Sequence, residues 1–339
     1  MWTLQNETDF SAAHLLSQSF RTGRTIWQVA VKGTFSILPK GGLEISEDQV
    51  EVFSSPEFRE REDSSSIVYN NDLEAQYKDK TDVLINGHAY APDEKRAKKT
   101  PVAAIIGTWS KQLKVVGNRY WDRIMGIMYT TEPDYFEKIP ITYEYAFGGM
   151  EECKDGLVYF LDNPVGTGYA KRKSNRVGQA LPNIEYPRHG TKKGKPYKNK
   201  VAGFGPLCGH WNPRIQYAGT YDKQWEENRF PLYPDDFNPR FYQCAPLDQQ
   251  VPGIQGGEPV QLVGLTPGMG LLEFKLPVIK LGFFTALGKK MIQHDASLHS
   301  IIIEPDFPRL QMVWYTSVDC HGQEQNLDST LIECTIKQL

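Results

Sequence analysis

The stretch Thr25-Ile26-Trp27-Gln28-Val29-Ala30-Val31-Lys32-Gly33-Thr34-Phe35 does most to decide the fold. It is rich in β-branched and aromatic residues, which favour a pleated and partly buried strand. The turn residues Pro39-Lys40-Gly41-Gly42 follow it and lead into a second candidate strand, Leu43 to Val52. We therefore expect two strands joined by a turn near the N-terminus.

Strand signals recur along the chain, whereas helical periodicity is scarce. The two best helical stretches are residues 10–18 and residues 222–228, the second with Thr220 or Asp222 as its cap. Further expected strands are short and bounded by turn residues: 82–90, 102–109, 113–116, 119–121, 260–263, 270–276, 300–304 and 310–315. This pattern predicts a mainly β fold, a sandwich or an open-barrel-like arrangement of antiparallel sheets, with few short helices.

The 339 residues are enough for one large β domain or two ordinary ones. We expect a single compact unit over residues 1–339. It would contain an N-terminal strand region (20–125), a loop-rich aromatic segment (126–250) and a C-terminal strand region (251–339). A hydrophobic content of 40% with 12% aromatic and 23% charged residues is typical of a soluble globular protein.

Composition also argues against several classes of protein. The net charge of -3 argues against general binding to nucleic acid or to a membrane surface. No apolar run reaches the roughly 18 residues of a membrane span, and the N-terminus lacks the pattern of a signal peptide. The five scattered cysteines indicate reduced thiols. We therefore expect a cytoplasmic protein without a membrane partner.

Charge is unevenly distributed along the chain. Residues 44–94 contain fourteen acidic and four basic residues, whereas residues 171–200 contain ten basic residues and one acidic residue, Glu185. Opposite charges on two parts of one surface could orient a protein partner. The basic stretch also contains Tyr186 and Tyr197, as a site for single-stranded nucleic acid would. Its rings are few, so a lysine-rich loop is the favoured interpretation.

Residues 203–250 combine aromatic, proline, glycine and charged residues without a regular period. Tryptophan, tyrosine and arginine side chains of this kind anchor protein–protein contacts or hold an irregular segment together. The candidate protein-binding residues are Trp211, Arg214, Tyr221, Asp222, Trp225 and Arg240. The alternative is that these residues stabilise the segment itself, with the two arginines paired to Asp222 or Asp236 and the rings buried.

Signals for chemistry are weak. Cys208-Gly209-His210 has no second Cys/His pair at a zinc-like spacing, and residues 165–171 indicate a turn instead of a phosphate-binding loop. We expect no metal, no other cofactor and no catalytic residue. The competing hypothesis is a hydrolase or carbohydrate-active enzyme of β-sandwich type that uses a carboxylate pair such as Glu144 and Asp222.

Several motifs, in the same order along the chain, resemble those of one bacterial family that is classified as a domain of unknown function. They include Trp27-x-Val-x-Val-Lys-Gly-Thr-Phe35, Gly87-His-Ala-Tyr-Ala-Pro92, Tyr143-Glu-x-Ala-Phe-Gly-Gly149, Asn163-Pro-Val-Gly166, Ala218-Gly-Thr-Tyr-Asp222 with Trp225, and Ala245-Pro-x-Asp-Gln-Gln250. The resemblance extends from about residue 20 to residue 280. It implies an accessory role in type VI secretion, as an adaptor or chaperone that binds a toxin effector and helps load it onto the VgrG or PAAR spike. It supplies no catalytic residues.

Overall fold

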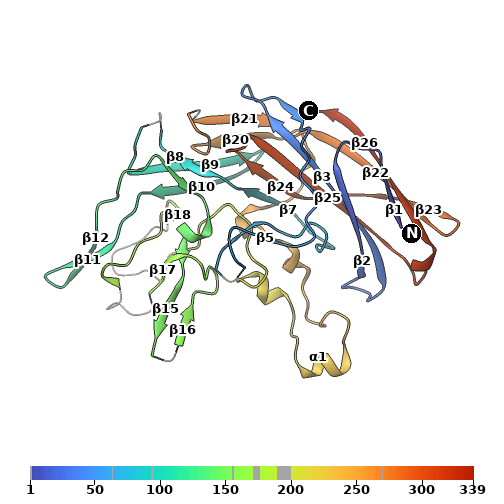
Figure 1. The fold of residues 1–339 in the computed structure, drawn as a ribbon, viewed down its shortest axis with the longest axis horizontal. Coiled ribbons are helices and arrows are strands. Elements are labelled where there is room, and N and C mark those ends of the chain that lie inside the picture. The colour runs from blue at the N-terminus through green and yellow to red at the C-terminus, as the bar shows by residue number, and fades with distance from the viewer. Residues whose placement is uncertain are drawn as a thin grey trace.

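The computed structural model describes residues 2–62, 64–92, 95–154, 156–170, 176–188, 200–268 and 270–339. Three larger sheets dominate this part of the chain (Figure 1). The seven-stranded sheet contains, in spatial order, β19 (Gln250–Val251), β7 (Thr81–Ile85), β24 (Ser297–Glu304), β25 (Arg309–Asp319), β3 (Thr25–Ile37) and β2 (Ser11–Gln18), and β4 (Leu43–Ile45) also pairs with β3.

The other two large sheets have five and four strands. The five-stranded sheet has the order β18 (Ile184–Glu185), β10 (Trp109–Val116), β9 (Lys99–Ile106), β20 (Pro259–Val263) and β21 (Leu271–Lys275). The four-stranded sheet has the order β1 (Thr3–Asn6), β26 (Leu327–Gln338), β22 (Val278–Leu287) and β23 (Lys290–Asp295).

Small ribbons and short helices make up the remaining regular structure of the described residues. The two-stranded ribbons are β5 (Glu57–Phe58) with β6 (Ile67–Tyr69), β8 (His88–Tyr90) with β13 (Lys138–Pro140), β11 (Trp121–Ile124) with β12 (Ile127–Thr130), β14 (Phe147–Gly148) with β17 (Thr167–Gly168), and β15 (Met150–Cys153) with β16 (Gly156–Tyr159). The helices are α1 (Lys223–Asn228) and the 3-10 helices η2 (Tyr143–Tyr145), η5 (Arg214–Tyr217), η6 (Pro239–Tyr242), η7 (Leu247–Gln249) and η8 (Glu324–Asn326).

Strand β3 is buried along nearly its whole length. It pairs with β25 on one side and with β2 and β4 on the other. Since side chains alternate along a strand, Trp27, Val29 and Val31 share one face while Gln28 and Lys32 share the other. The seven-stranded sheet therefore has an apolar face and a polar face.

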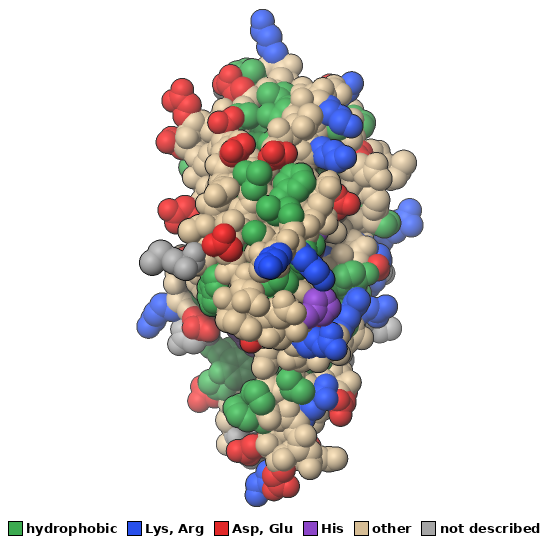
Figure 2. Space-filling view, turned by 90° about the vertical axis from the view of Figure 1, so that its right-hand side faces the viewer, with side chains coloured by type: hydrophobic (Ala, Val, Ile, Leu, Met, Phe, Trp, Pro, Cys, Tyr) green, Lys and Arg blue, Asp and Glu red, His purple; other side chains and the backbone are tan. Residues whose placement is uncertain are grey.

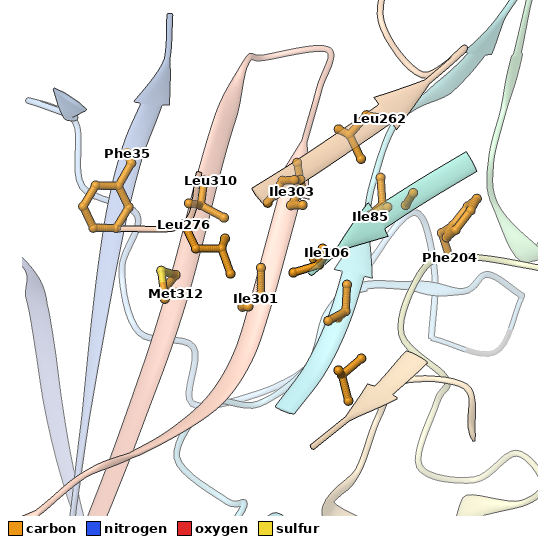
Figure 3. Packing of buried hydrophobic residues seen from close by; sticks show 14 of the residues in the cluster. Phe35, Ile85, Ile106, Phe204, Leu262, Leu276, Ile301, Ile303, Leu310 and Met312 are labelled. Carbon is orange, nitrogen blue, oxygen red and sulfur yellow. The ribbon is translucent and has the colours of Figure 1, made fainter. Parts of the chain in front are cut away.

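The apolar face packs into the main hydrophobic core. This core also receives residues from the five-stranded sheet, such as Ile106 and Leu262, and from the four-stranded sheet, such as Phe283. Figure 3 shows Ile301 and Met312 of the seven-stranded sheet beside residues of the other strands. Removal of this apolar surface from water is the main source of stability expected for the fold.

The polar face is covered by two irregular segments, residues 46–80 and 203–250. Lys32 Nζ lies 2.8 Å from Asp72 Oδ2 of the first segment, and both side chains are buried. Asp82 on β7 accepts hydrogen bonds from Gln243 and from the backbone N–H of Cys244 in the second segment. Buried polar groups of this kind fix the loops in place, because leaving them unpaired is unfavourable.

The prediction of a mainly β fold is confirmed, and none of the sheets in the described part of the chain closes into a barrel. The expected helix over residues 10–18 is wrong, because Ser11–Gln18 is strand β2 and pairs with β3 along its whole length. The expected strand from Leu43 to Val52 forms only over Leu43–Ile45. The expected short helix at 222–228 is confirmed as α1, and its cap is Asp222, whose side chain accepts from Trp225 N.

Among the residues that the structure describes, we find no helix with the length and apolar character needed to cross a membrane.

Candidate functional site

Residues 203–250 cover part of the polar face and then extend away from it as a loop that contains α1 (Figure 1). The base of this segment is tied to the sheets. Gln249 Nε2 donates to Val83 O of β7 at 2.6 Å, and within the segment Leu207 N donates to Cys244 O at 2.7 Å. Cys244 also packs with Leu84 and Ile302 on the polar side of the sheet. The segment is irregular, but its base is firmly held.

Two of the six candidate residues lie in this base. Trp211 is 1% exposed, and its ring meets Tyr143 edge to face at 5.7 Å between centroids. Arg214 is 4% exposed and donates hydrogen bonds to Leu207 O, Phe241 O and Asn70 Oδ1. Both side chains therefore stabilise the segment, as the alternative interpretation of the sequence expected.

The carboxylates expected to pair with the arginines have other roles. Asp222 caps α1, and Asp236 accepts from the backbone N–H and the hydroxyl of Thr220. The predicted ion pairs of Arg214 and Arg240 with these two aspartates are therefore wrong within the described residues. Backbone carbonyls meet most of the hydrogen-bonding requirement of Arg214 instead.

The projecting loop is organised around Trp225. Its indole N–H donates to Leu232 O at 2.8 Å, which closes the loop after α1. The rings of Tyr221 and Phe230 pack edge to face against it, with centroids 4.8 and 5.5 Å away. Tyr221 and Phe230 are 55% and 66% exposed. Because α1 has only six residues, its backbone hydrogen bonds alone would not hold it, and the Asp222 cap and the packing around Trp225 add to them.

A cavity of about 610 Å³ lies between this loop and the body of the protein; we call it the aromatic cavity. Its lining consists of Gln18, Glu74, Gly209, His210, Ile215, Ala218, Tyr221, Trp225, Pro231, Leu232, Tyr233, Phe237, Phe241 and Tyr242. Figure 2 views the molecule from the side that carries β23 and the N-terminus in Figure 1, and shows hydrophobic side chains in a hollow above the narrow lower end. The volume lies within the range of ordinary ligand sites, about 300–1,000 Å³.

Among the described residues that line the aromatic cavity, Glu74 is the one acidic side chain. Burial, followed by the influence of Tyr233 and Glu74, raises the pKa of the Tyr221 hydroxyl. Burial lowers the pKa of His210, with Glu62 acting in the opposite direction, so this imidazole is neutral at pH 7. No local sequence signal indicated Glu74, which lies far from residues 203–250 along the chain.

A second cavity of about 800 Å³ lies on another side of the segment and is lined by Tyr143, Phe160, Asp162, Tyr186, Lys200, Val201, Leu207, Asn212, Pro213, Gln216, Pro246, Leu247 and Asp248. Asp248 lies 2.8 Å from the buried Lys111 Nζ. Burial lowers the pKa of Lys111 to about 8, although Asp248 opposes this shift. Arg240 lines a third cavity of about 330 Å³.

The structure therefore does not unite the six candidate residues in one cleft. Tyr221 and Trp225 line the aromatic cavity. Asp222 holds α1 in place, and Arg240 is exposed beside a different cavity. Four further aromatic residues that line the same cavity belong to the segment singled out in the sequence: Tyr233, Phe237, Phe241 and Tyr242.

The carboxylates proposed for an enzyme have structural partners. Glu144 accepts from Ser66 N at 2.7 Å and from Ser66 Oγ at 3.1 Å. Burial alone would raise the pKa of Glu144, but hydrogen bonds from Thr142 and Ser66 lower it overall. Asp222 caps α1 and is exposed. Neither residue lines the aromatic cavity or the second cavity, so the geometry lends this pair no support.

The remaining sequence hypotheses concern metals and nucleic acid. No group of three or more His, Cys, Asp or Glu side chains in the described part of the chain is arranged to hold a metal ion. Within the described residues, the turn expected over residues 165–171 is found only at Pro164–Val165, and it is followed by strand β17. The basic stretch 171–200 lies largely outside the described residues, which omit 171–175 and 189–199.

A family model described as "Uncharacterized protein conserved in bacteria (DUF2169)" matches residues 22–315. The chain therefore belongs to this bacterial family. The match includes most of the seven-stranded sheet, all of the five-stranded sheet and all of residues 203–250. Searches of curated proteins and of solved structures found no match to the chain.

Proposed function

We propose that this member of the DUF2169 family is a cytoplasmic adaptor or chaperone of bacterial type VI secretion. It would bind a toxin effector and promote its loading onto the VgrG or PAAR spike. Two observations support the proposal. The motifs that resemble such accessory proteins lie between about residues 20 and 280, and the family match over residues 22–315 includes all the motifs quoted above, from Trp27 to Gln250.

The observation that carries the proposal is the aromatic cavity. Tyr221 and Trp225 present ring surfaces beside a concave site of about 610 Å³. Tryptophan and tyrosine in such positions are the residues that most often dominate the energy of a protein–protein contact. The fixed position of the Trp225 ring, whose N–H is already bound, reduces the entropy that is lost on binding.

The effector would place one segment in the aromatic cavity and cover the rings around it. Phe230 at the end of α1 and Tyr221 at its start extend the apolar surface beyond the cavity. A contact that is limited to the cavity and the rings around it would be moderate in size. Such a contact suits a chaperone that must later release its cargo. No covalent chemistry is required of the chain in this role.

The proposal is tested by deleting the gene and measuring secretion of the toxin that is encoded beside it. We expect loss of secretion, and we expect the purified chain to form a defined complex with that toxin by size-exclusion chromatography with light scattering. Normal secretion in the deletion strain, together with no complex in solution, would contradict the proposal.

Matched variants test whether the aromatic cavity is the binding surface. The double variant Tyr221→Ala with Phe230→Ala removes two exposed rings beside the cavity, and we expect at least about a tenfold loss of affinity for the toxin. Tyr135→Ala with Phe307→Ala removes two rings elsewhere that are somewhat more exposed, and serves as the control. Equal losses in both variants would show that the cavity has no special role.

A further inference from the structure

We propose that the aromatic cavity binds an arginine side chain in a segment of the effector, an inference that rests on the proposed function. The described residues that line the cavity include six Tyr, Trp and Phe side chains and one carboxylate, that of Glu74. A guanidinium group is attracted to ring faces, stacks on them and pairs with a carboxylate. The cavity therefore has the chemistry of a cation-binding cage.

The rings offer their faces, because their polar atoms are largely occupied. The indole N–H of Trp225 donates to Leu232 O, so this side chain has no donor left for a ligand. The hydroxyl of Tyr242 bonds to the hydroxyl of Tyr233 at 3.3 Å. Tyr233 also packs against Phe237, with centroids 4.7 Å apart.

Glu74 supplies the negative charge. Its backbone N–H donates to Asn71 Oδ1 at 2.9 Å, which fixes the turn that carries it. Within the described residues its carboxylate has no hydrogen-bond or ion-pair partner, and the side chain is exposed. An unpaired carboxylate beside a group of rings leaves a position for a cation from another molecule.

The protein's own cations near the cavity do not take this position. Arg214 lies 5.2 Å from the centroid of Phe241 but is held by its hydrogen bonds to Leu207 O and Phe241 O. Arg229 pairs with Asp235 at 3.2 Å and donates to Tyr233 O. None of the ring–cation contacts within the described chain involves Tyr221 or Trp225, which meet each other edge to face.

A pair of short peptides tests the inference without the effector. The probes are Ac-Gly-Arg-Gly-NH2 and the same peptide with citrulline, which has nearly the shape of arginine but no charge. Titration calorimetry with the full chain should show at least about tenfold tighter binding of the arginine peptide, and this preference should shrink as salt increases. Equal binding of the two peptides would overturn the inference.

Matched variants test whether the arginine peptide binds in the aromatic cavity. Glu74→Gln should weaken arginine-peptide binding by about threefold to fivefold, the usual effect of one exposed ion pair. Glu227→Gln removes an exposed carboxylate of α1 that does not line the cavity and should leave binding unchanged. Tyr221→Ala should weaken binding, whereas Tyr221→Phe, which keeps the ring face, should retain it. Identical behaviour of Glu74→Gln and Glu227→Gln would also overturn the inference.

The inference and the adaptor proposal fail in different ways. An arginine peptide that fails to bind, while the neighbouring toxin still forms a complex, would overturn the cation site alone. An arginine peptide that binds through Glu74, while the deletion strain secretes the toxin normally and the purified chain forms no complex with it, would support the cation site and overturn the adaptor role.

Discussion

Lys78 and Asp82 form an ion pair, with Nζ 2.7 Å from Oδ2, in which the two side chains are 3% and 0% exposed. Burial disfavours the charge on Lys78, but the nearby Asp82 outweighs it and raises the pKa of the lysine. Lys78 also donates to Ser300 on β24, and Asp82 accepts from Gln243. This pair therefore links two strands of the seven-stranded sheet to the base of the aromatic segment.

Replacing Lys78 by methionine should destabilise the protein by about 3–5 kcal/mol, because it leaves the Asp82 carboxylate buried without its cation. Urea unfolding followed by tryptophan fluorescence measures the change. Arg96→Met is the control, since the Arg96–Glu137 pair is exposed and should contribute less than about 1 kcal/mol. Similar small losses in both variants would show that the buried pair does not anchor the segment.

Trp211 and Tyr221 should differ sharply when they are replaced by alanine. Trp211→Ala creates a cavity in the main core and should cost about 3–5 kcal/mol of stability. Tyr221 is more than half exposed, so Tyr221→Ala should cost less than about 1 kcal/mol. Thermal melting of the two variants tests this, and a large loss for Tyr221→Ala would mean that the projecting loop depends on this ring for its fold.

Much of the sheet structure was predictable because its strands are rich in β-branched residues and bounded by turns. Strand β2 was not, because Ser11–Gln18 contains alanine and leucine, whose helix propensity is overridden here by pairing with β3. The strands β22, β23 and β26 were not predicted either. Much of the outer half of β26 is exposed, which weakens the alternation that a strand needs for recognition from sequence.

The candidate site was predictable only in part. The aromatic segment could be recognised by composition, and Tyr221 and Trp225 do line a cavity. Sequence alone does not distinguish the buried Trp211 from the half-buried Trp225, since both stand in irregular, proline-rich surroundings. Glu74 reaches the cavity only through tertiary structure, because its segment covers the polar face beside the aromatic segment.

Gly41 lies in the turn after β3, where an alanine should be poorly tolerated. Its φ is +84°, and a Cβ atom there would lie 2.2 Å from the carbonyl oxygen of Glu273 in β21. Gly126 has nearly the same φ, +81°, with nothing within 4 Å of the same position. Both Gly→Ala variants should lose about 1–2 kcal/mol through the backbone conformation.

The steric clash should add about 1–3 kcal/mol in Gly41→Ala alone. Chemical denaturation of the two variants isolates this contribution, because the conformational cost is shared. Equal stability of the two variants would indicate that β21 moves away from the turn without cost. The close contact between Gly41 and Glu273 would then not fix the seven-stranded sheet relative to the five-stranded sheet.

His294 on β23 should make the stability of the protein depend on pH. Burial lowers its pKa to about 4, with Asp295 opposing the shift, and its ring lies 2.8 Å from Thr285 Oγ1 and 2.7 Å from Thr316 Oγ1. In the unfolded chain a histidine has a pKa of about 6.5. Between these two values the unfolded state binds more protons, so the free energy of unfolding should fall as the pH falls from about 6.5 to about 4.

His294→Gln should reduce this dependence, because glutamine does not titrate and can still bond to a threonine hydroxyl. Urea unfolding of the variant and of the natural chain is measured at pH 7 and at pH 4.5. Between these two pH values the natural chain should lose more stability than the variant. His321→Asn changes a histidine that is exposed at the surface and serves as the control. If the His294 variant lost as much stability as the control between pH 7 and pH 4.5, protonation of the His294 imidazole would not be linked to unfolding of the four-stranded sheet.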